Sequence, residues 1–383
     1  MKLLFAPDSF KGSLTAIQIT DILEKVAARH FPGADTVSIP VADGGEGTTD
    51  ALLRADFGQR FRIPVTGPLF EKEDAIWGML GDGETAVMEM AQASGLPYVA
   101  EAHRDPRNTT SVGTGELIRN AIQRGATKIL IGIGGSATND GGMGMLTALG
   151  AKFTDKDGQE VSPVGGSLIK VAHADFSGLM PQLRDVEITV ICDVTNPLLG
   201  ESGATWIYGP QKGATPAIRD ELEEGMANYS KVVSETVGRD IAGFPGAGAA
   251  GGLGAALGGV LQAKLKSGID AVLEAVRFDQ KLEGVDLVVT GEGRIDGQSV
   301  RFGKVPVGVA KRCAARNIPV IAIVGGIGDG AEGLFDICES TIQTTVSGPM
   351  TLEKAMSDAP ALYEYAAERL FRAIRIGMKL AEK

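Results

Sequence analysis

The chain has 383 residues, of which 44% are hydrophobic and 22% are charged, and this composition excludes intrinsic disorder as its main state. At roughly 150 residues per domain, the length points to about two domains. The 37 Lys and Arg residues against 48 Asp and Glu residues give a net charge of −11, which argues against sequence-independent binding to nucleic acid or to an anionic membrane. Glycine is frequent, with 53 residues, so we expect glycine-rich loops to carry the function.

The N-terminal part of the chain repeats a strand–loop–helix pattern. Residues 2–6 form an apolar run that predicts a buried strand, and Thr15 with Gln18 resembles a capping box at the start of a helix. A second predicted strand at 36–41 leads into a glycine-rich loop and a helix that begins near Thr48. Repeated units of this kind are typical of a parallel α/β sheet.

The middle of the chain predicts a second α/β region. Between about residues 60 and 90, short alternating segments separated by turns predict strands with antiparallel or mixed pairing. Further predicted elements follow in order: a helix at 114–124, a strand at 128–133, a glycine-rich loop, a helix near Met143, a strand at 187–192 and a helix at 217–237. The uncharged segment 241–263 is long enough to cross a bilayer, but its many glycine and alanine residues favour a packed loop and helix.

The C-terminal part returns to the first pattern. Strands are predicted at 285–290 and 319–324, with a helix at 305–315 between them and a last helix at 362–381. We therefore expect the two ends of the chain to share one sheet.

The cysteines and histidines argue against several kinds of site. The three cysteines are widely spaced and form no CxxC pair, so neither a disulfide framework nor a zinc cage is expected. The N-terminal sequence reaches Asp8 before a secretory hydrophobic segment could be completed, and we expect a cytoplasmic protein. His30, His103 and His173 are scattered, and we expect them at the surface.

Two loops near the ends of the chain combine acids, hydroxyls and cations. The first follows the strand at 2–6 and carries Asp8, Ser9 and Lys11, and the other follows the strand at 285–290 and carries Glu292, Arg294 and Asp296, with Lys304 soon after. Open α/β sheets bind ligands at the carboxyl ends of their strands, which is where these loops begin. The sequence therefore predicts that both loops contribute to a ligand site.

The loop after the strand at 128–133 is the richest in glycine. Its polar residues and bare backbone suit a phosphate group at a helix N-terminus; they are Gly134, Gly135, Ser136, Thr138, Asn139 and Asp140. The pattern Gly132-x-Gly134-x-x-Ala137 also resembles a dinucleotide fingerprint, so a nicotinamide-dependent Rossmann oxidoreductase stays open as a competitor. Asp193, after the strand at 187–192, is suited to hold magnesium or to take a proton.

Taken together, the loops resemble the type 1 glycerate kinase family. The resemblance covers nearly the whole chain in order and rests on four motifs: Ala6-Pro7-Asp8-Ser9-Phe10-Lys11, Val41-Ala42-Asp43-Gly44-Gly45-Glu46-Gly47, Gly134-Gly135-Ser136-Ala137-Thr138-Asn139-Asp140-Gly141-Gly142 and Thr290-Gly291-Glu292-Gly293-Arg294-Ile295-Asp296. It implies an α/β fold in which a second α/β domain with a mixed sheet is inserted into a Rossmann-like parallel-sheet domain, with the active site in the cleft between them. We place the first domain at 1–66 plus 284–383 and the inserted domain at 67–283.

The resemblance also implies ATP-dependent phosphorylation of D-glycerate, at the C2 hydroxyl, to 2-phosphoglycerate, with ATP as co-substrate and Mg²⁺ as cofactor. Phosphorylation at C3 remains an alternative, as does a non-catalytic metabolite-binding protein. The expected partners are these small molecules, and binding to nucleic acid or to a membrane is not expected. A homodimer is a possible oligomeric state.

Within this framework, each candidate residue receives a role. We expect Lys11 and Arg294 to hold the glycerate carboxylate or the transferred phosphoryl group, because a protein of net charge −11 needs focused cations for two anionic substrates. Asp296 or Asp193 is expected to accept the hydroxyl proton, with preference for Asp296, and Asp193 is the candidate metal ligand. The expected substrate-binding residues are Asp8, Ser9, Asp43, Glu292 and Lys304.

Overall fold

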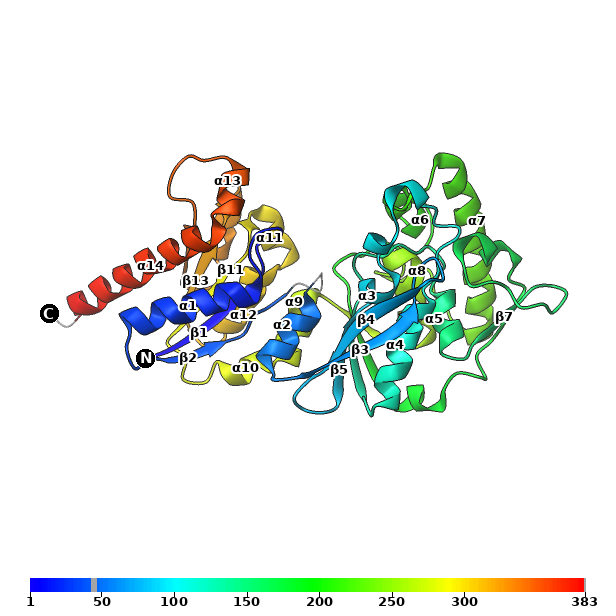
Figure 1. Cartoon of the computed structure of the whole chain (residues 1–383), viewed down its shortest axis with the longest axis horizontal. Coiled ribbons are helices and arrows are strands. Elements are labelled where there is room, and N and C mark those ends of the chain that lie inside the picture. Colours follow the sequence, from blue (N-terminus) through cyan, green and yellow to red (C-terminus); the bar gives the residue numbers. More distant parts are fainter. Residues whose placement is uncertain (43–46, 382–383) are drawn as a thin grey trace. The chain divides into compact units, whose positions relative to one another are not determined.

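The chain forms two units, each built around its own β-sheet (Figure 1). The computed structural model describes residues 1–42 and 47–381; Asp43, an expected substrate-binding residue, lies outside them. Among the described residues, the first unit comprises 1–42, 50–56 and 269–381, and the second comprises 47–49 and 57–268. The predicted α/β class, with a second sheet inserted in sequence into a parallel one, is confirmed.

The first unit has a parallel sheet of five strands in the order β15-β13-β11-β1-β2. The strands are β1 (Lys2–Pro7), β2 (Asp35–Ser38), β11 (Leu287–Gly291), β13 (Val320–Val324) and β15 (Ser340–Thr344). The helices are α1 (Ala16–His30), α2 (Thr48–Ala55), α9 (Gly268–Ala275), α10 (Phe278–Lys281), α11 (Gly297–Phe302), α12 (Val305–Ala314), α13 (Leu352–Ser357) and α14 (Ala359–Ala381), and β12 (Arg294–Ile295) pairs with β14 (Gly326–Ile327). Both ends of the chain thus share one sheet, as predicted.

Helices α1 and α14 lie side by side and cover one face of this sheet (Figure 1). The predicted capping box of α1 is present, because Thr15 Oγ1 accepts from Gln18 N at 3.2 Å while Thr15 N donates to Gln18 Oε1 at 2.9 Å. The expectation that His30 lies at the surface was wrong. It ends α1 facing α14, where its Nε2 is 2.5 Å from Glu368 Oε2 and its ring is buried near Phe371.

The second unit has a mixed sheet of six strands in the order β10-β9-β6-β5-β4-β3. The strands are β3 (Gln59–Thr66), β4 (Lys72–Met79), β5 (Thr85–Glu89), β6 (Lys128–Gly132), β9 (Glu187–Ile191) and β10 (Lys264–Lys266), and β7 (Lys152–Thr154) pairs with β8 (His173–Asp175). The predicted mixture is confirmed, since β3, β4 and β5 pair antiparallel and the others in parallel. The predicted boundary after residue 66 lies beyond the change of unit at residue 57, because β3 pairs with β4 along its whole length.

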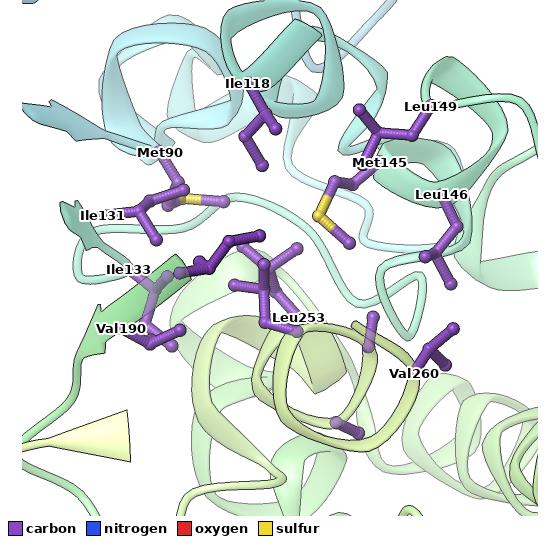
Figure 2. Close-up of a cluster of buried hydrophobic side chains, with 14 of the residues drawn as sticks. Met90, Ile118, Ile131, Ile133, Met145, Leu146, Leu149, Val190, Leu253 and Val260 are labelled. Atoms are coloured by element: carbon purple, nitrogen blue, oxygen red, sulfur yellow. The ribbon is translucent and has the colours of Figure 1, made fainter. Parts of the chain in front are cut away.

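A large apolar core lies between this sheet and its helices. The helices are α3 (Ala91–Ser94), α4 (Val112–Gln123), α5 (Met143–Ala148), α6 (Ala204–Tyr208), α7 (Pro216–Val237) and α8 (Ala249–Ala255). Figure 2 shows how Ile131 and Val190 of the strands, Met145 of α5 and Leu253 of α8 converge there. The uncharged segment 241–263 supplies α8 and much of this core, so its interpretation as a packed loop and helix is confirmed. None of the helices in the described part of the chain combines the length and the apolar character that a membrane crossing requires.

Candidate functional site

The first unit gathers charged residues in one pocket at the carboxyl ends of two neighbouring strands. Strands β1 and β11 are paired in parallel and end together, with Pro7 opposite Gly291. The backbone then keeps the two following loops adjacent, because Asp8 N donates to Gly291 O at 2.9 Å. A pocket of about 610 Å³ opens there, and six of the predicted site residues line it: Asp8, Ser9, Lys11, Glu292, Arg294 and Lys304.

The pocket has acidic side chains in its interior and cationic ones at its opening. Glu292 and Asp8 are only 5% and 6% exposed, whereas Lys11, Arg294 and Lys304 are exposed. On another side the lining is apolar, with Phe10, Val346, Leu352 and Met356. This arrangement can hold an anionic ligand by its cations while buried carboxyl groups face the bound molecule.

Glu292 has an unusual electrostatic environment for a carboxylic acid. Burial raises its pKa to about 7, and the neighbouring charges of Asp8 and Asp296 add to the rise, while Lys304 opposes it. Ser299 lies beside this carboxyl group, yet neither Oγ of Ser299 nor Oε1 of Glu292 has a hydrogen-bond partner of normal geometry in the described chain. A buried polar atom without a partner is costly and is commonly found where a ligand binds.

Asp296 occupies a different position, at the N-cap of α11. Its Oδ1 accepts from Gln298 N at 3.0 Å and from Ser299 N at 3.1 Å, and its Oδ2 lies 3.6 Å from Nε of Arg294. The hydrogen bond from the Ser299 backbone, together with that from Gln298 and the charges of Arg294 and Lys304, lowers its pKa. The predicted pair Arg294 and Asp296 is thus brought together, and both line a second pocket, together with Arg301 and Asp329.

In the second unit, only the first part of the glycine-rich loop between β6 and α5 is exposed to solvent. Gly134 and Gly135 are exposed, whereas Ser136, Thr138, Asn139 and Asp140 are buried. An added Cβ at Gly134 would meet nothing within 4 Å, so its backbone is open to a close approach. The bare amides available to a phosphate are therefore at the start of the loop.

Asp140 holds the loop and two helices together. Its carboxylate accepts from Ser111 N at 2.8 Å, Ser111 Oγ at 2.7 Å, Gly142 N at 3.1 Å and Gly144 N at 3.2 Å. Burial raises its pKa, and these hydrogen bonds oppose the rise. Asn139 Nδ2 likewise donates inside the unit, to Thr205 Oγ1 at 3.2 Å. These contacts give both side chains a structural role, and a direct contact with ATP stays a prediction.

Lys212, to which sequence reasoning gave no role, is buried against the same loop and donates hydrogen bonds to it. Its ammonium group donates to Ser136 Oγ at 2.8 Å and to Thr138 O at 2.6 Å, and it is only 2% exposed. Burial lowers its pKa to about 7, although Asp140 opposes this. Lys212 stands between prolyl and glycyl residues in the segment Gly209-Pro210-Gln211-Lys212-Gly213, and this local sequence gives no indication of its distant partners.

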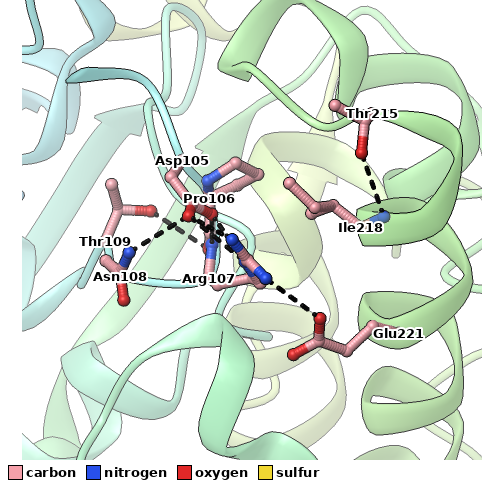
Figure 3. Close-up of polar contacts among 8 residues, drawn as sticks. All are labelled: Asp105, Pro106, Arg107, Asn108, Thr109, Thr215, Ile218 and Glu221. Atoms are coloured by element: carbon pink, nitrogen blue, oxygen red, sulfur yellow. Dashed lines mark hydrogen bonds and ion pairs between the residues drawn. The ribbon is translucent and has the colours of Figure 1, made fainter.

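Two further contacts fix the loop. Gly141 N donates to Gly251 O at 3.0 Å, and an added Cβ at Gly251 would lie 2.0 Å from Thr138 O. The glycine-rich part of the segment 241–263 therefore packs directly against this loop. Thr109 Oγ1 donates to Ala137 O at 3.1 Å. Figure 3 shows the segment that carries Thr109, in which Arg107 pairs with Asp105 and reaches Glu221 of α7.

Acidic residues flank the glycine-rich loop at the ends of the neighbouring strands. Strands β5, β6 and β9 are parallel neighbours, and Glu89 ends β5 while Asp193 follows β9. Asp193 is exposed and its Oδ1 accepts from Gly268 N at 2.8 Å. Glu89, which the sequence reasoning missed although it ends an apolar strand, is buried and accepts from Thr49 N at 2.8 Å at the start of α2.

The candidate residues therefore form one group in each unit. Asp296 belongs to the first unit and Asp193 to the second, so the pair of proposed bases is not brought together within either unit. Among the described residues, no three His, Cys, Asp or Glu side chains are grouped closely enough to hold a metal ion by themselves.

Comparison with known proteins gives matches over the full length. A sequence model of the glycerate kinase family matches residues 3–375. The chain is 48% identical to the glycerate 2-kinase of Escherichia coli (strain K12), over 100% of both chains, and 48% identical to the glycerate kinase of Bacillus subtilis (strain 168), over 100% of this chain and 99% of that one. The crystal structure of a protein assigned as glycerate kinase 2 from Salmonella typhimurium LT2 is similar with a TM-score of 0.90 at 42% identity, covering 99% of each chain.

Proposed function

The chain belongs to the glycerate kinase family, and we propose that it transfers the γ-phosphoryl group of ATP to the C2 hydroxyl of D-glycerate, giving 2-phosphoglycerate and ADP. The observation that carries the proposal is the 48% identity over the full length with a glycerate 2-kinase. The regiochemistry rests on that relative's name, and C3 remains the alternative acceptor.

The pocket of the first unit is the proposed glycerate site. Phosphoryl transfer asks the protein to position two anions and to spread negative charge in the transition state. Lys11 and Arg294 are exposed cations at this pocket, and Lys304 lines it as well. They supply the charge that holds the substrate carboxylate or the transferred group, while Asp8 and Ser9 offer hydrogen-bonding groups to the substrate hydroxyls.

The glycine-rich loop of the second unit is the proposed phosphate site for ATP. The exposed backbone of Gly134 and Gly135 precedes α5, and Lys212 and Asp140 keep the buried part of the loop in place. Bare amides at such a turn suit a polyanion. The buried Ser136 and Thr138 act in this proposal through the backbone conformation that they help to fix.

Asp193 is the proposed ligand for Mg²⁺. It is exposed, carries a carboxylate and follows the strand beside the glycine-rich loop. A single carboxylate fits this ion, because Mg²⁺ is usually held by one or two carboxylates, by water and by the phosphates of the nucleotide. When bound, Mg²⁺ neutralises charge on the phosphate oxygens.

The activity is tested by incubating the protein with ATP, Mg²⁺ and D-glycerate and following ADP. Phosphorus NMR of the product distinguishes the positions, because a phosphate on C2 couples to one proton and a phosphate on C3 couples to two. A parallel assay with nicotinamide cofactor tests the oxidoreductase alternative. Thermal stabilisation by D-glycerate without ADP formation would identify a binding protein and would contradict the kinase proposal.

We further propose a cytoplasmic location. Cys192, Cys313 and Cys338 are all free, as suits a reducing compartment. A homodimer stays a proposal that a sedimentation measurement would test.

A further inference from the structure

Glu292 is a buried carboxyl group at the inner wall of the proposed glycerate pocket. It directly follows Gly291, the last residue of β11, and is 5% exposed although it lines the pocket. Its Oε1 has no hydrogen-bond partner in the described chain. An acceptor atom that is buried, unpartnered and part of a pocket lining is suited to receive a hydrogen bond from a bound hydroxyl group.

The charges that act on Glu292 come from three different loops of the first unit. Asp8 follows β1, Asp296 begins α11, and Lys304 precedes α12, and all three influence the titration of the Glu292 carboxyl group. Lys11 and Arg294 line the same pocket. Burial, helped by the two acids and opposed by Lys304, raises the pKa of Glu292 to about 7, so that near neutral pH the group is both available as a carboxylate and basic enough to bind a proton.

Asp296 is less suited than Glu292 to accept a proton from a bound hydroxyl group. Its Oδ1 is engaged by two backbone amides of α11 and its Oδ2 faces Arg294, and these contacts lower its pKa. A carboxylate that is stabilised in its charged form is a weaker proton acceptor. Its contacts are those of a helix cap, which fixes the loop that carries Glu292 and Arg294.

We propose that Glu292, through Oε1, is the catalytic residue that accepts the proton of the substrate hydroxyl group, in place of Asp296. This inference rests on the proposed kinase function. As the hydroxyl O–H bond breaks, its proton goes to Glu292, and the oxygen forms a bond to the γ-phosphorus of ATP. The bond between that phosphorus and the β–γ bridging oxygen breaks, and ADP leaves with the electron pair. Glu292 afterwards releases its proton to solvent.

The test compares Glu292→Gln, Glu292→Asp and Asp296→Asn in the full chain, with Glu332→Gln as a control at an exposed glutamate of the same unit. Steady-state kinetics are measured from pH 5.5 to 9, and the Kd of D-glycerate is measured by calorimetry. We expect kcat/KM of the wild type to fall about tenfold for each pH unit below about 7. Glu292→Gln should lose about 10²- to 10⁴-fold in kcat and should lose this acid limb, while the Kd changes little.

The other variants separate catalysis from structure. Glu292→Asp keeps a carboxylate and should recover part of the rate together with the acid limb, whereas Asp296→Asn should keep the limb, and Glu332→Gln should behave as wild type. A Glu292→Gln variant with nearly wild-type kcat, or an acid limb abolished only by Asp296→Asn, would overturn the inference. If the wild type itself forms no ADP from D-glycerate, the proposed function fails instead, and the two failures are therefore distinguishable.

Discussion

At the scale of single residues, the position of Glu292 carries a cost for folding. Its pKa is about 7 in the folded protein, against an ordinary value of 4.5. Between these values the folded state binds more protons than the unfolded state, so the free energy of unfolding falls as pH rises through this window. Above pH 7 the folded protein carries the full penalty of a buried carboxylate.

Glu292→Gln should therefore make the protein more stable at pH 8, by about 1–3 kcal/mol. The gain should shrink as pH falls and should vanish below about pH 4, where the wild-type carboxyl group is protonated in both states. Urea unfolding of both proteins at several pH values measures it. If the difference in free energy of unfolding between the variant and the wild type is the same at pH 5 and at pH 8, Glu292 has an ordinary pKa and the prediction fails.

The exposed cations of the pocket give a prediction about activity. Lys11→Ala and Arg294→Ala should each lower kcat/KM for D-glycerate by about 10- to 100-fold, the loss expected for a hydrogen bond to a charged group. Their folding should be unaffected, because both side chains are exposed. Lys25→Ala, at an exposed lysine of α1, is the control. A variant with wild-type kinetics would remove that residue from the site.

The residues that sequence reasoning could place are those whose neighbours are set by strand topology. Asp8 and Glu292 each follow an apolar strand, and adjacent parallel strands end at the same edge of a sheet. The role of Asp296 as a cap was not predicted, because α11 has no clear apolar periodicity and was not expected as a helix. The partners of Lys212 lie 74 and 76 positions away, and no local pattern encodes such a contact.

At the scale of elements, the glycine-rich loop can be tested where it is open. Gly134→Val and Gly135→Val should both raise the KM for ATP, because a side chain would block approach to the amides. Gly134 is the sharper site, since Gly135 has a φ of +74° and would also be strained by a side chain. Gly377→Val, in the exposed part of α14, is the matched control. An unchanged KM in a folded Gly134→Val protein would contradict the proposed phosphate site.

Lys212 couples the stability of this loop to pH. Its pKa is about 7 in the folded protein and 10.5 ordinarily, so between these values the unfolded chain binds more protons. The free energy of unfolding should therefore rise with pH across this window, relative to Lys212→Met, which has no such charge. Chemical unfolding of both proteins at pH 7 and pH 9.5 measures the difference. Parallel pH dependences would show that the buried amine titrates as it does in water.

The elements that could be predicted are those with strong local patterns. The capping residues Thr15 and Gln18 predicted the start of α1. The short alternating segments between residues 60 and 90 predicted the antiparallel strands β3 to β5. Strand β15 has the sequence STIQT, which carries too few apolar residues to stand out, and only its pairing with β13 makes it a strand. The left-handed backbone of Ala250, Gly251 and Gly252 likewise depends on packing against a distant loop.

At the scale of the whole molecule, the two units have separate hydrophobic cores. Among the described residues, the buried members of one core lie between Val65 and Val260, and those of the other core lie in the two ends of the chain. The insertion was foreseeable, because the strand–helix pattern of the N-terminus returns after the middle region. Its limits were not, since the strands from 60 onwards could be assigned to a unit only once their partners were known.

We therefore predict that a fragment of residues 57–268 folds by itself. It contains the whole six-stranded sheet and its core, and a segment inserted into another unit is commonly autonomous. Its far-UV circular dichroism should show mixed helix and strand, and thermal unfolding should be cooperative. The fragment of residues 1–56, which lacks three strands of its sheet, is the control and should be unfolded. An unfolded 57–268 fragment would show that its core needs the rest of the chain.

The pairing of β1 with β11 has a consequence for folding during synthesis on the ribosome. The Thr290 hydroxyl donates to Ala6 O, 284 positions earlier in the chain. At a synthesis rate of about 5–20 residues per second, the first strand waits roughly 15–60 s for its central neighbour to be made. During that time the inserted unit can complete its own sheet, while β1 has β2 as a possible neighbour but lacks β11 on its other side and is open there to chaperones or to aggregation. We therefore expect the unit that is encoded in the middle of the chain to be the first to fold.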